Sequence, residues 1–269
     1  HKGTHLPYLG YGLLAADDRD RFRVHDHWPN AIGQRIVRFF EETRAAGAKR
    51  YLDFACGGGQ FGLEACYHGA QSVGFDLATS ALVAGRQYAR DNQLDAHYVR
   101  AEPTALPFQP QAFDAMALKD ALHHLPDARG ALKAAKRVLK EEAGVLIIDH
   151  VADKPRWEKL RQKVFEKCGP SLLRQYPRIE GAEVFQSLSP CEFASLEDIR
   201  DVIRDEVEIA EWRNELLFAD EITLPIYLTT GRKKFPAEYV SRMIYRAERI
   251  ALLWGGPRFI FVRGRVKSL

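Results

Sequence analysis

Residues 51–62 read YLDFACGGGQFG, and this stretch decides the fold. An apolar run contains Asp53, three consecutive glycines follow at 57–59, and a helical pattern begins near Gln60. The pattern predicts a strand, a tight turn and a helix. In open α/β sheets ligands bind beyond the carboxyl ends of the strands, and glycines let the backbone approach them closely. The stretch therefore predicts a ligand-binding turn, although a glycine-rich turn alone also fits a structural role.

Short apolar runs alternate with helical patterns along the rest of the chain. The expected strands cover residues 50–55, 71–76, 96–101, 114–119, 144–149, 207–217 and 258–266. The expected helices cover residues 31–47, 78–92, 127–142, 154–169, 195–206 and 236–256, and residues 58–69 are expected to be a glycine-rich turn running into a further helix. This alternation predicts an α/β fold, with a mostly parallel sheet, helices on both of its faces and right-handed crossovers.

The 269 residues are enough for one α/β domain with additional helices. We expect an N-terminal helical cap segment at residues 1–48 and the main domain at residues 49–269. Helical insertions are expected after the fifth strand, at about residues 153–205, and between the last two strands, at about residues 219–256. These insertions are expected to form a helical cap over the site.

Composition sets limits on function. The net charge of +3 is small, so nucleic acid is an unlikely partner on composition alone. The four cysteines have no C-x-x-C spacing, so we expect reduced thiols and no metal site. No apolar run approaches the ~20 residues of a membrane span. No secretory signal is visible, and a cytoplasmic protein is expected.

A second acidic residue follows at the end of the next expected strand. Asp76 closes the run SVGFD, where a carboxylate can accept hydrogen bonds from a ribose diol. The nicotinamide dinucleotide fingerprint has a similar logic but a different glycine spacing. Here the large residues Gln60 and Phe61 follow the last glycine. Asp76 also fits a simpler role, as the N-cap of the following helix.

Five motifs in a fixed order carry a family resemblance. They are LDFACGGG (52–59), VGFD (73–76), AEPTALPF (101–108), FDAMALKDALHHLPD (113–127) and RVLKEEAGVLIIDH (137–150). In this order they resemble class I S-adenosylmethionine-dependent methyltransferases, most closely the branch that includes the ubiquinone- and menaquinone-biosynthesis enzymes. The resemblance implies a Rossmann-like sheet of seven strands with the last strand antiparallel. It also implies S-adenosyl-L-methionine as cofactor and S-adenosyl-L-homocysteine as product.

The resemblance assigns the glycine-rich turn to the methionine part of the cofactor. Asp53, Gly57 and Gly59 match the family's first motif, an acidic residue followed by G-x-G-x-G. Ala55 replaces the usual first glycine, so its methyl group is expected to tighten the pocket. From the residues alone, Asp53 also fits a role as the cap of the following turn.

The remaining motifs supply contacts to the nucleoside and the sulfonium. By the resemblance, Asp76 binds the ribose hydroxyls and Leu77 packs on the adenine. Glu102 stands where the family often has Asp, and would accept from the adenine amino group with Pro103 beside it. A solvated loop carboxylate is the simpler interpretation of Glu102. Lys119 ends the fourth strand, next to the cofactor's sulfonium and carboxylate.

Candidate catalytic residues follow the fourth and fifth strands. His123 and His124 stand in DALHHLPD, and Asp149 stands in IIDH. A histidine oriented by a carboxylate is a common general base near neutral pH. Related small-molecule O-methyltransferases carry His and Asp at these places, so one histidine is expected to act as base and Asp149 to orient it. A structural role for either histidine is the alternative.

These features together favour methyl transfer to a small-molecule acceptor, with O-methylation preferred because of the histidine pair. Two alternatives stay open. The basic stretches in the C-terminal third fit an RNA or protein methyltransferase, and Ala55 and Glu102 fit a non-methylating member of the fold. The sequence identifies neither the acceptor nor the oligomeric state.

Overall fold

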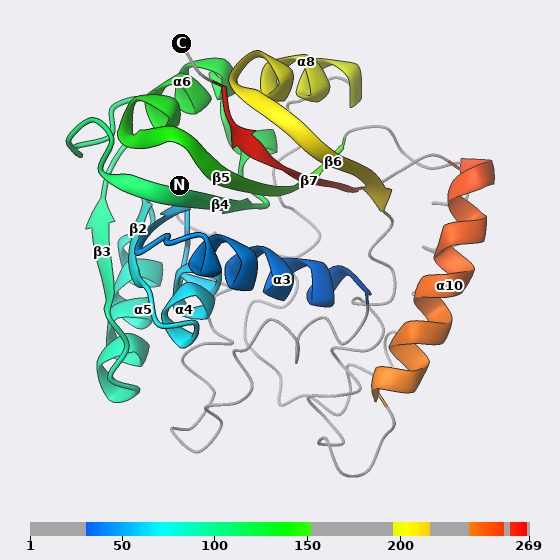
Figure 1. Ribbon diagram of the computed structural model, residues 1–269, viewed down its shortest axis with the longest axis horizontal. Helices are drawn as coiled ribbons and strands as arrows, with labels where there is room; N and C mark the ends of the chain where they lie inside the picture. The colour runs from blue at the N-terminus through cyan, green and yellow to red at the C-terminus, as the bar shows by residue number, and fades with distance from the viewer. Residues whose placement is uncertain (1–30, 152–195, 216–236, 256–258, 268–269) are drawn as a thin grey trace.

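The computed structural model describes residues 31–151, 196–215, 237–255 and 259–267, and these form a sheet between two layers of helices (Figure 1). The strands are β1 (Arg50–Phe54), β2 (Gln71–Asp76), β3 (Ala96–Arg100), β4 (Phe113–Lys119), β5 (Leu139–His150), β6 (Val207–Glu215) and β7 (Phe259–Val266). The helices are α3 (Ala31–Ala45), α4 (Gln60–Tyr67), α5 (Thr79–Asp91), α6 (Ala128–Val138), α8 (Leu196–Glu206) and α10 (Ala237–Gly255), with a 3₁₀ turn η3 (Leu122–His124) before α6.

The described strands form one seven-stranded sheet in the order β3-β2-β1-β4-β5-β7-β6. Neighbouring strands are parallel from β3 to β5, whereas β7 runs antiparallel to both β5 and β6. The predicted α/β sheet, mostly parallel with the last strand antiparallel, is therefore confirmed. Since β7 is antiparallel to both of its neighbours, β6 points in the same direction as β5.

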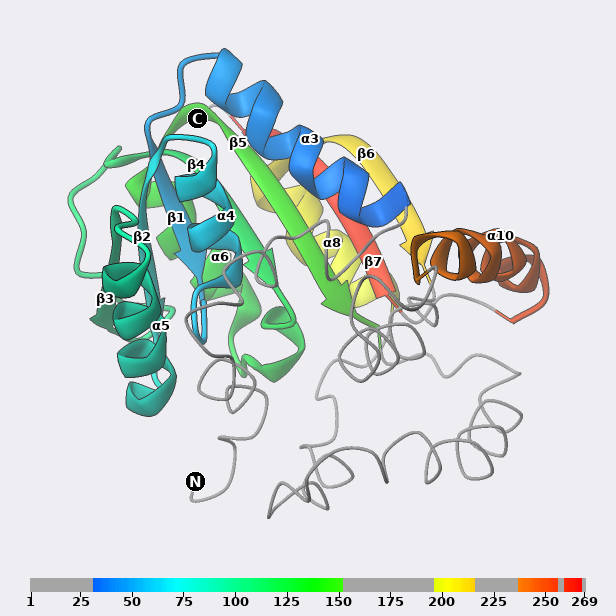
Figure 2. The same cartoon turned by 90° about the horizontal axis from the view of Figure 1, so that it is seen from below.

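Helices cover both faces of the sheet, as the sequence pattern predicts. Figure 2 shows α3, α4 and α5 on one face and α6 and α8 on the other. Helix α10 lies beside the end of β6 (Figure 2), where the Tyr245 hydroxyl donates a hydrogen bond of 3.2 Å to Glu215 Oε1.

The central strands are apolar on both faces because both faces are covered. Leu52 and Leu118 belong to the core beneath α6 and α8. Tyr51, the residue adjacent to Leu52, belongs with Phe40 to the core beneath α3 and α4. Each fully buried Leu or Phe side chain contributes about 1.5–3 kcal/mol to the stability of such a layer. The helices thereby hold the strand ends, and the side chains that follow them, in place.

The helix expected over residues 127–142 is shorter in the structure. Its apolar stripe is buried as predicted, but α6 ends at Val138. Leu139 is extended, with φ −85° and ψ 147°, and pairs with Phe113 of β4. The sequence-based boundary is wrong because Leu139 is the last residue of the helical stripe and also a buried strand residue, so periodicity alone does not separate the two.

Several expectations fall on parts of the chain outside the described residues. They include the expected helix at 154–169 and residues 1–30 of the N-terminal segment. The helical cap and the boundary at residues 48–49 therefore stay predictions. Among the described residues, no helix has the length and apolar character that crossing a membrane requires.

Candidate active site

The strand order places the candidate site at the middle of the sheet. Strand β1 is followed along the chain by β2 on one side, and β4 lies against β1 on the other. In open α/β sheets ligands bind at this switch point, outside the carboxyl ends of the strands. The sequence-predicted residues lie at or just after these ends: Asp53 on β1 with Ala55 just after it, Asp76 on β2 with Leu77 just after it, Glu102 after β3, Lys119 on β4 and Asp149 on β5.

The glycine-rich turn has an unusual backbone. Ala55, Gly57 and Gly59 all have positive φ, at 48°, 53° and 88°. The turn is closed by a 2.7 Å hydrogen bond that the Gly59 amide donates to the Cys56 carbonyl, and Gly59 is the N-cap of α4. Glycine adopts positive φ readily, whereas an L-residue is strained there, so Ala55 stands at a costly position.

Asp76 holds this turn from the side of β2. Its Oδ2 accepts a 2.8 Å hydrogen bond from the Gly57 amide, and its Oδ1 accepts a 2.8 Å hydrogen bond from the Ala78 amide. A carboxylate offers about four lone-pair sites, so these two bonds leave capacity for the hydroxyls of a ribose. The adjacent Leu77 side chain is 47% exposed, which leaves an apolar surface on which an adenine can pack.

Asp53 is buried beneath the turn. Its Oδ2 accepts a 2.7 Å hydrogen bond from the Gly62 amide in the first turn of α4. Its pKa is raised to about 8, mainly by burial and to a smaller extent by the negative charge of Asp76, while the Gly62 amide and the charge of Lys119 act in the opposite direction. The contact with Gly62 is the turn-capping role that the sequence left open, and the structure shows no exposed face of Asp53 comparable to that of Asp76.

The other residues expected to contact the cofactor lie on the same edge. Lys119, at the end of β4, forms an ion pair with Asp120, which has a φ of 51°. The Glu102 side chain is exposed in the loop after β3, beside the half-buried Pro103. An exposed carboxylate fits both interpretations of Glu102, so its contact with adenine stays a prediction.

The ends of β4 and β5 bring the three candidate catalytic residues close together. The His123 Nδ1 lies 2.5 Å from Asp149 Oδ1, and both side chains are buried. Asp149 Oδ2 accepts hydrogen bonds from the amides of Ala121 (3.1 Å) and Leu122 (2.6 Å). Asp149 therefore fixes both the turn after β4 and the ring of His123.

His124 differs from His123 in its surroundings. Its side chain is exposed, and its ring centroid lies 3.8 Å from that of His123. The His123 ring, in contrast, is buried and lies within hydrogen-bond distance of Asp149. The geometry thus singles out His123 as the histidine that a carboxylate orients.

Sequence reasoning missed Tyr98, a buried residue of β3 whose hydroxyl donates a 3.3 Å hydrogen bond to the Gly58 carbonyl. It also missed Glu215, a buried carboxylate at the end of β6. The signal available for Tyr98 was its place in a predicted strand, which does not reveal that the ring lies against a turn 40 residues earlier in the chain.

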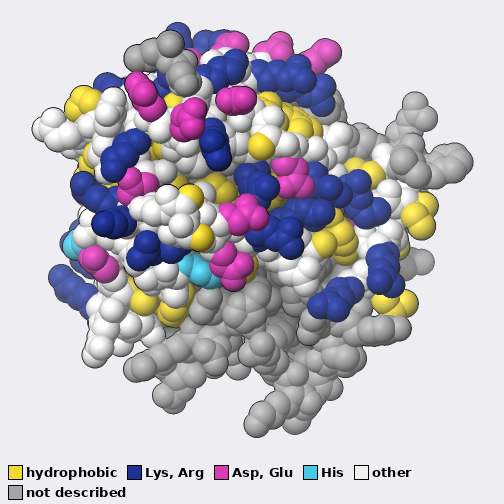
Figure 3. All heavy atoms as spheres, in the orientation of Figure 1, with side chains coloured by type: hydrophobic (Ala, Val, Ile, Leu, Met, Phe, Trp, Pro, Cys, Tyr) yellow, Lys and Arg dark blue, Asp and Glu magenta, His cyan; other side chains and the backbone are white. Residues whose placement is uncertain are grey.

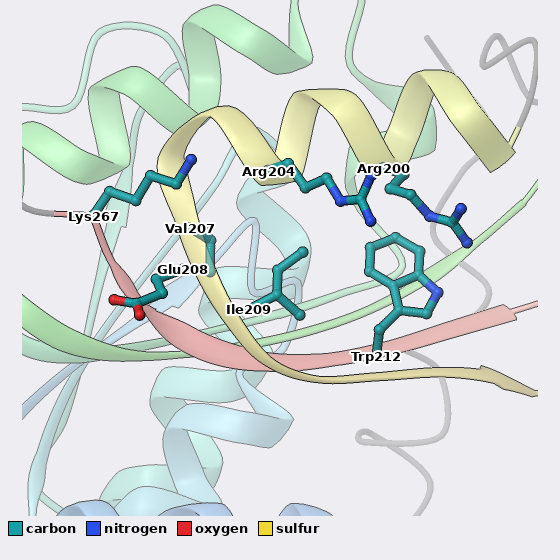
Figure 4. A pocket seen from close by; sticks show the side chains of 7 residues that line it. All are labelled: Arg200, Arg204, Val207, Glu208, Ile209, Trp212 and Lys267. Carbon is teal, nitrogen blue, oxygen red and sulfur yellow. The ribbon is translucent and has the colours of Figure 1, made fainter.

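A separate groove of about 610 Å³ lies between α8 and β6. Figure 4 shows Arg200 and Arg204 on the helix and Trp212 on the strand around it. Val207 and Ile209, which also line it, stand at the amino end of β6. That end belongs to the edge of the sheet opposite the carboxyl ends of β1 and β4, so the groove is distinct from the candidate active site.

Comparison with known proteins identifies the class. A family model described as "Methyltransferase domain" matches residues 52–148. Those residues include the glycine-rich turn, Asp76 and the pair of His123 with Asp149. They form a class I S-adenosylmethionine-dependent methyltransferase domain, and S-adenosylmethionine is its cofactor.

Within that class, the domain is similar to enzymes of the ubiquinone-type branch. The ubiquinone biosynthesis O-methyltransferase of Haemophilus ducreyi is 31% identical over 144 residues, covering 48% of this chain and 60% of that protein. The protein of the same name from Glaesserella parasuis is 30% identical over 124 residues, covering 44% of this chain and 51% of that protein. The chain thus spans about half the length of the curated relatives it matches.

Solved structures extend the likeness in fold beyond the matched domain. The crystal structure of the [4+2]-cyclase SpnF superposes with a TM-score of 0.55 at 16% identity, covering 87% of this chain and 80% of that chain. At this identity the likeness shows the fold alone.

Proposed function

We propose that the protein transfers a methyl group from S-adenosylmethionine to a hydroxyl oxygen of a small molecule, with His123 as the general base. The observation that carries this proposal is the buried pair of His123 and Asp149 at the carboxyl edge of the sheet. The names of the ubiquinone-type relatives, which are O-methyltransferases, support the same chemistry.

The pair has the arrangement of an oriented base. In this arrangement Asp149 accepts a hydrogen bond from Nδ1–H of His123, and Nε2 is the ring nitrogen that takes the proton. The acceptor hydroxyl gives its proton to Nε2 while its oxygen forms the bond to the methyl carbon. S-adenosylmethionine supplies a methyl group that is already activated by a positively charged sulfur. The protein's part is to align the oxygen, take the proton and exclude water.

A histidine base favours a phenolic acceptor over an aliphatic alcohol. The hydroxyl of a phenol has a pKa near 10, as in the tyrosine side chain, so the proton transfer to an imidazole is only moderately uphill. An aliphatic hydroxyl is a far weaker acid and needs a stronger base. We therefore propose a small aromatic molecule with a ring hydroxyl as the acceptor class.

The charge pattern supports a small molecule over RNA. Figure 3 shows Lys and Arg side chains interspersed with Asp and Glu on this face of the molecule. In the described part of the basic C-terminal third, Arg249 pairs with Glu215, Arg263 with Glu42, and Arg265 with Glu142. Arginines paired in this way are less available for phosphates.

The test compares the two adjacent histidines. S-adenosylhomocysteine formation is measured with a panel of phenols, aliphatic alcohols and amines, using wild type, His123→Gln and His124→Gln. We expect product with phenols, a 10²–10⁴-fold lower kcat in His123→Gln, and a change of at most a few-fold in His124→Gln. Equal activity of His123→Gln and wild type would contradict the base assignment, and methylation of amines alone would contradict O-methylation.

A binding measurement keeps this test interpretable. Both variants should bind S-adenosylhomocysteine with wild-type affinity, since neither histidine is part of the cofactor turn. Cofactor binding without product from any acceptor of the panel would favour the alternative of a non-methylating protein.

A further inference from the structure

The glycine-rich turn rests on a tyrosine of β3. Tyr98 is 7% exposed and stands in register beside Gly74 of β2. Its hydroxyl donates a 3.3 Å hydrogen bond to the carbonyl of Gly58, at the centre of the turn. Its own carbonyl accepts a 3.0 Å hydrogen bond from Arg86 on α5, so the tyrosine is tied to the neighbouring helix as well.

Two glycines make room for this ring. A Cβ placed on Gly59 would lie closer than 3.0 Å to the Tyr98 hydroxyl and ring. A Cβ placed on Gly85 of α5 would lie 2.8 Å from the ring and would also collide with the Gly58 carbonyl. Glycine in the middle of a helix costs roughly 0.5–1 kcal/mol relative to alanine, so Gly85 indicates a close approach that the packing requires.

The turn is thereby held at two peptide units, one on each side of the peptide that joins Gly57 to Gly58. Asp76 binds the amide of Gly57 from the side of β2, and Tyr98 binds the carbonyl of Gly58 from the side of β3. The turn needs such support because Ala55, Gly57 and Gly59 have positive φ. A backbone with positive φ at several residues is stable only where contacts from the surrounding structure hold it in that conformation.

We propose that Tyr98 is a positioning residue for the cofactor: its phenol, seated against Gly85, holds the glycine-rich turn in the conformation that receives S-adenosylmethionine. This inference rests on the placement of the cofactor at the turn. Tyr98 acts through the Gly58 carbonyl and makes no contact with the reacting atoms. When the hydroxyl is lost, the turn of the free protein samples other conformations. Cofactor affinity then falls in proportion to the fraction of molecules whose turn still has the binding conformation.

The test uses two matched tyrosines. Tyr98→Phe removes only the hydroxyl, and Tyr88→Phe is the control, because the Tyr88 hydroxyl lies 2.9 Å from the hydroxyl of Tyr67, a residue of α4. Three quantities are measured: S-adenosylhomocysteine affinity by calorimetry, the melting temperature, and amide hydrogen exchange of residues 57–60. Asp76→Ala serves as the reference for the cofactor site.

We expect Tyr98→Phe to bind S-adenosylhomocysteine about two- to tenfold more weakly, the range that loss of one neutral hydrogen bond produces. Exchange at residues 57–60 should rise in Tyr98→Phe and stay at the wild-type level in Tyr88→Phe. In the steady state, KM for S-adenosylmethionine should rise with kcat unchanged. Gly85→Ala, which presses on the same carbonyl, should weaken binding at least as much.

Three results would overturn the inference. Wild-type affinity in Tyr98→Phe with a lower melting temperature would show that the tyrosine is only structural. Equal losses of affinity in Tyr98→Phe and Tyr88→Phe would show a general effect of stability. Wild-type affinity in Asp76→Ala would show that the cofactor binds elsewhere. In that case the proposed cofactor site itself, and not only the role of Tyr98, would be wrong.

Discussion

At the scale of single residues, the departure of Ala55 from the family's usual glycine has a physical cost. Its φ of 48° lies in the left-handed region, where an L-residue loses roughly 1–2 kcal/mol. The methyl group is half-buried and packs against the main core, which offsets part of this cost. Ala55 therefore makes the protein less stable than a glycine at the same position would.

Ala55→Gly should raise the free energy of unfolding by about 0.5–1 kcal/mol, because the gain from relieved strain exceeds the extra flexibility of the unfolded glycine. Urea denaturation measures this change. Ala134→Gly, in the middle of α6, is the control and should lower stability by about 1 kcal/mol. The same loss in both variants would show that Ala55 is not strained.

Asp53 should make stability depend on pH. Its folded pKa of about 8 lies above the ordinary 3.8, so the protonated carboxyl is preferred in the folded state. The resulting contribution is fully present below about pH 4 and is lost as the pH rises to about 8. Asp53→Asn stays neutral, so from pH 5 to pH 9 it should gain roughly 3–5 kcal/mol of stability relative to wild type. A wild-type-to-variant difference that is constant with pH would contradict this prediction.

The sequence located residues that follow strand ends better than residues inside strands. Asp76 and Asp149 close apolar runs, so their place at the carboxyl edge could be predicted. Tyr98 could not be assigned, because its role depends on the gap left by Gly85 on another element. The choice between His123 and His124 also needed the structure, since the burial of the His123 ring and its contact with Asp149 cannot be read from adjacent positions in the sequence.

At the scale of elements, one buried carboxylate connects α10 to the sheet. Glu215 accepts a hydrogen bond from the Tyr245 hydroxyl of α10, and Arg249 of α10 lies 3.5 Å from its Oε2. Arg213 of β6 donates a 3.1 Å hydrogen bond to Oε1 of the same carboxylate. Burial raises the pKa of Tyr245, and the charge of Glu215 raises it further.

Glu215→Ala should lower the free energy of unfolding by about 2–3 kcal/mol, because it leaves two arginines and a tyrosine hydroxyl without this carboxylate. Arg265→Ala is the control. It breaks an exposed pair with Glu142 and should cost less than about 1 kcal/mol. Urea denaturation midpoints of the two variants measure the difference. Equal midpoints would show that Glu215 does not hold α10 to the sheet.

The boundaries of elements were predictable where a polar residue or glycine marks them. Asp127 caps α6 by accepting a 2.7 Å hydrogen bond from the Gly130 amide. No such signal separates Val138 from Leu139, where α6 passes directly into β5, and the predicted helix was accordingly too long.

At the scale of the whole molecule, the alternation of elements predicted a sheet covered on both faces, and the resemblance supplied its antiparallel last strand. The position of β7 between β5 and β6 could not come from periodicity, because it depends on pairing between distant segments. The cap expected over the site includes segments outside the described residues. The acceptor pocket that this cap is expected to form therefore stays a prediction.

We propose that the carboxyl edge at β1 and β2 binds S-adenosylmethionine through the glycine-rich turn and Asp76. Asp114 offers a matched control. It accepts hydrogen bonds of 2.8 Å from the amides of Lys49 and Arg50, so it also binds two backbone amides, but at the opposite edge of the sheet. Loss of either carboxylate removes hydrogen bonds to two backbone amides, but only Asp76 is expected to bind the cofactor.

The most direct measurement is therefore calorimetric titration of S-adenosylhomocysteine into wild type, Asp76→Ala and Asp114→Ala. We predict clear binding to wild type, an affinity at least tenfold lower in Asp76→Ala, and wild-type affinity in Asp114→Ala. Binding to Asp76→Ala as tight as to wild type would contradict the account, because the cofactor would then lie away from the turn that defines the site.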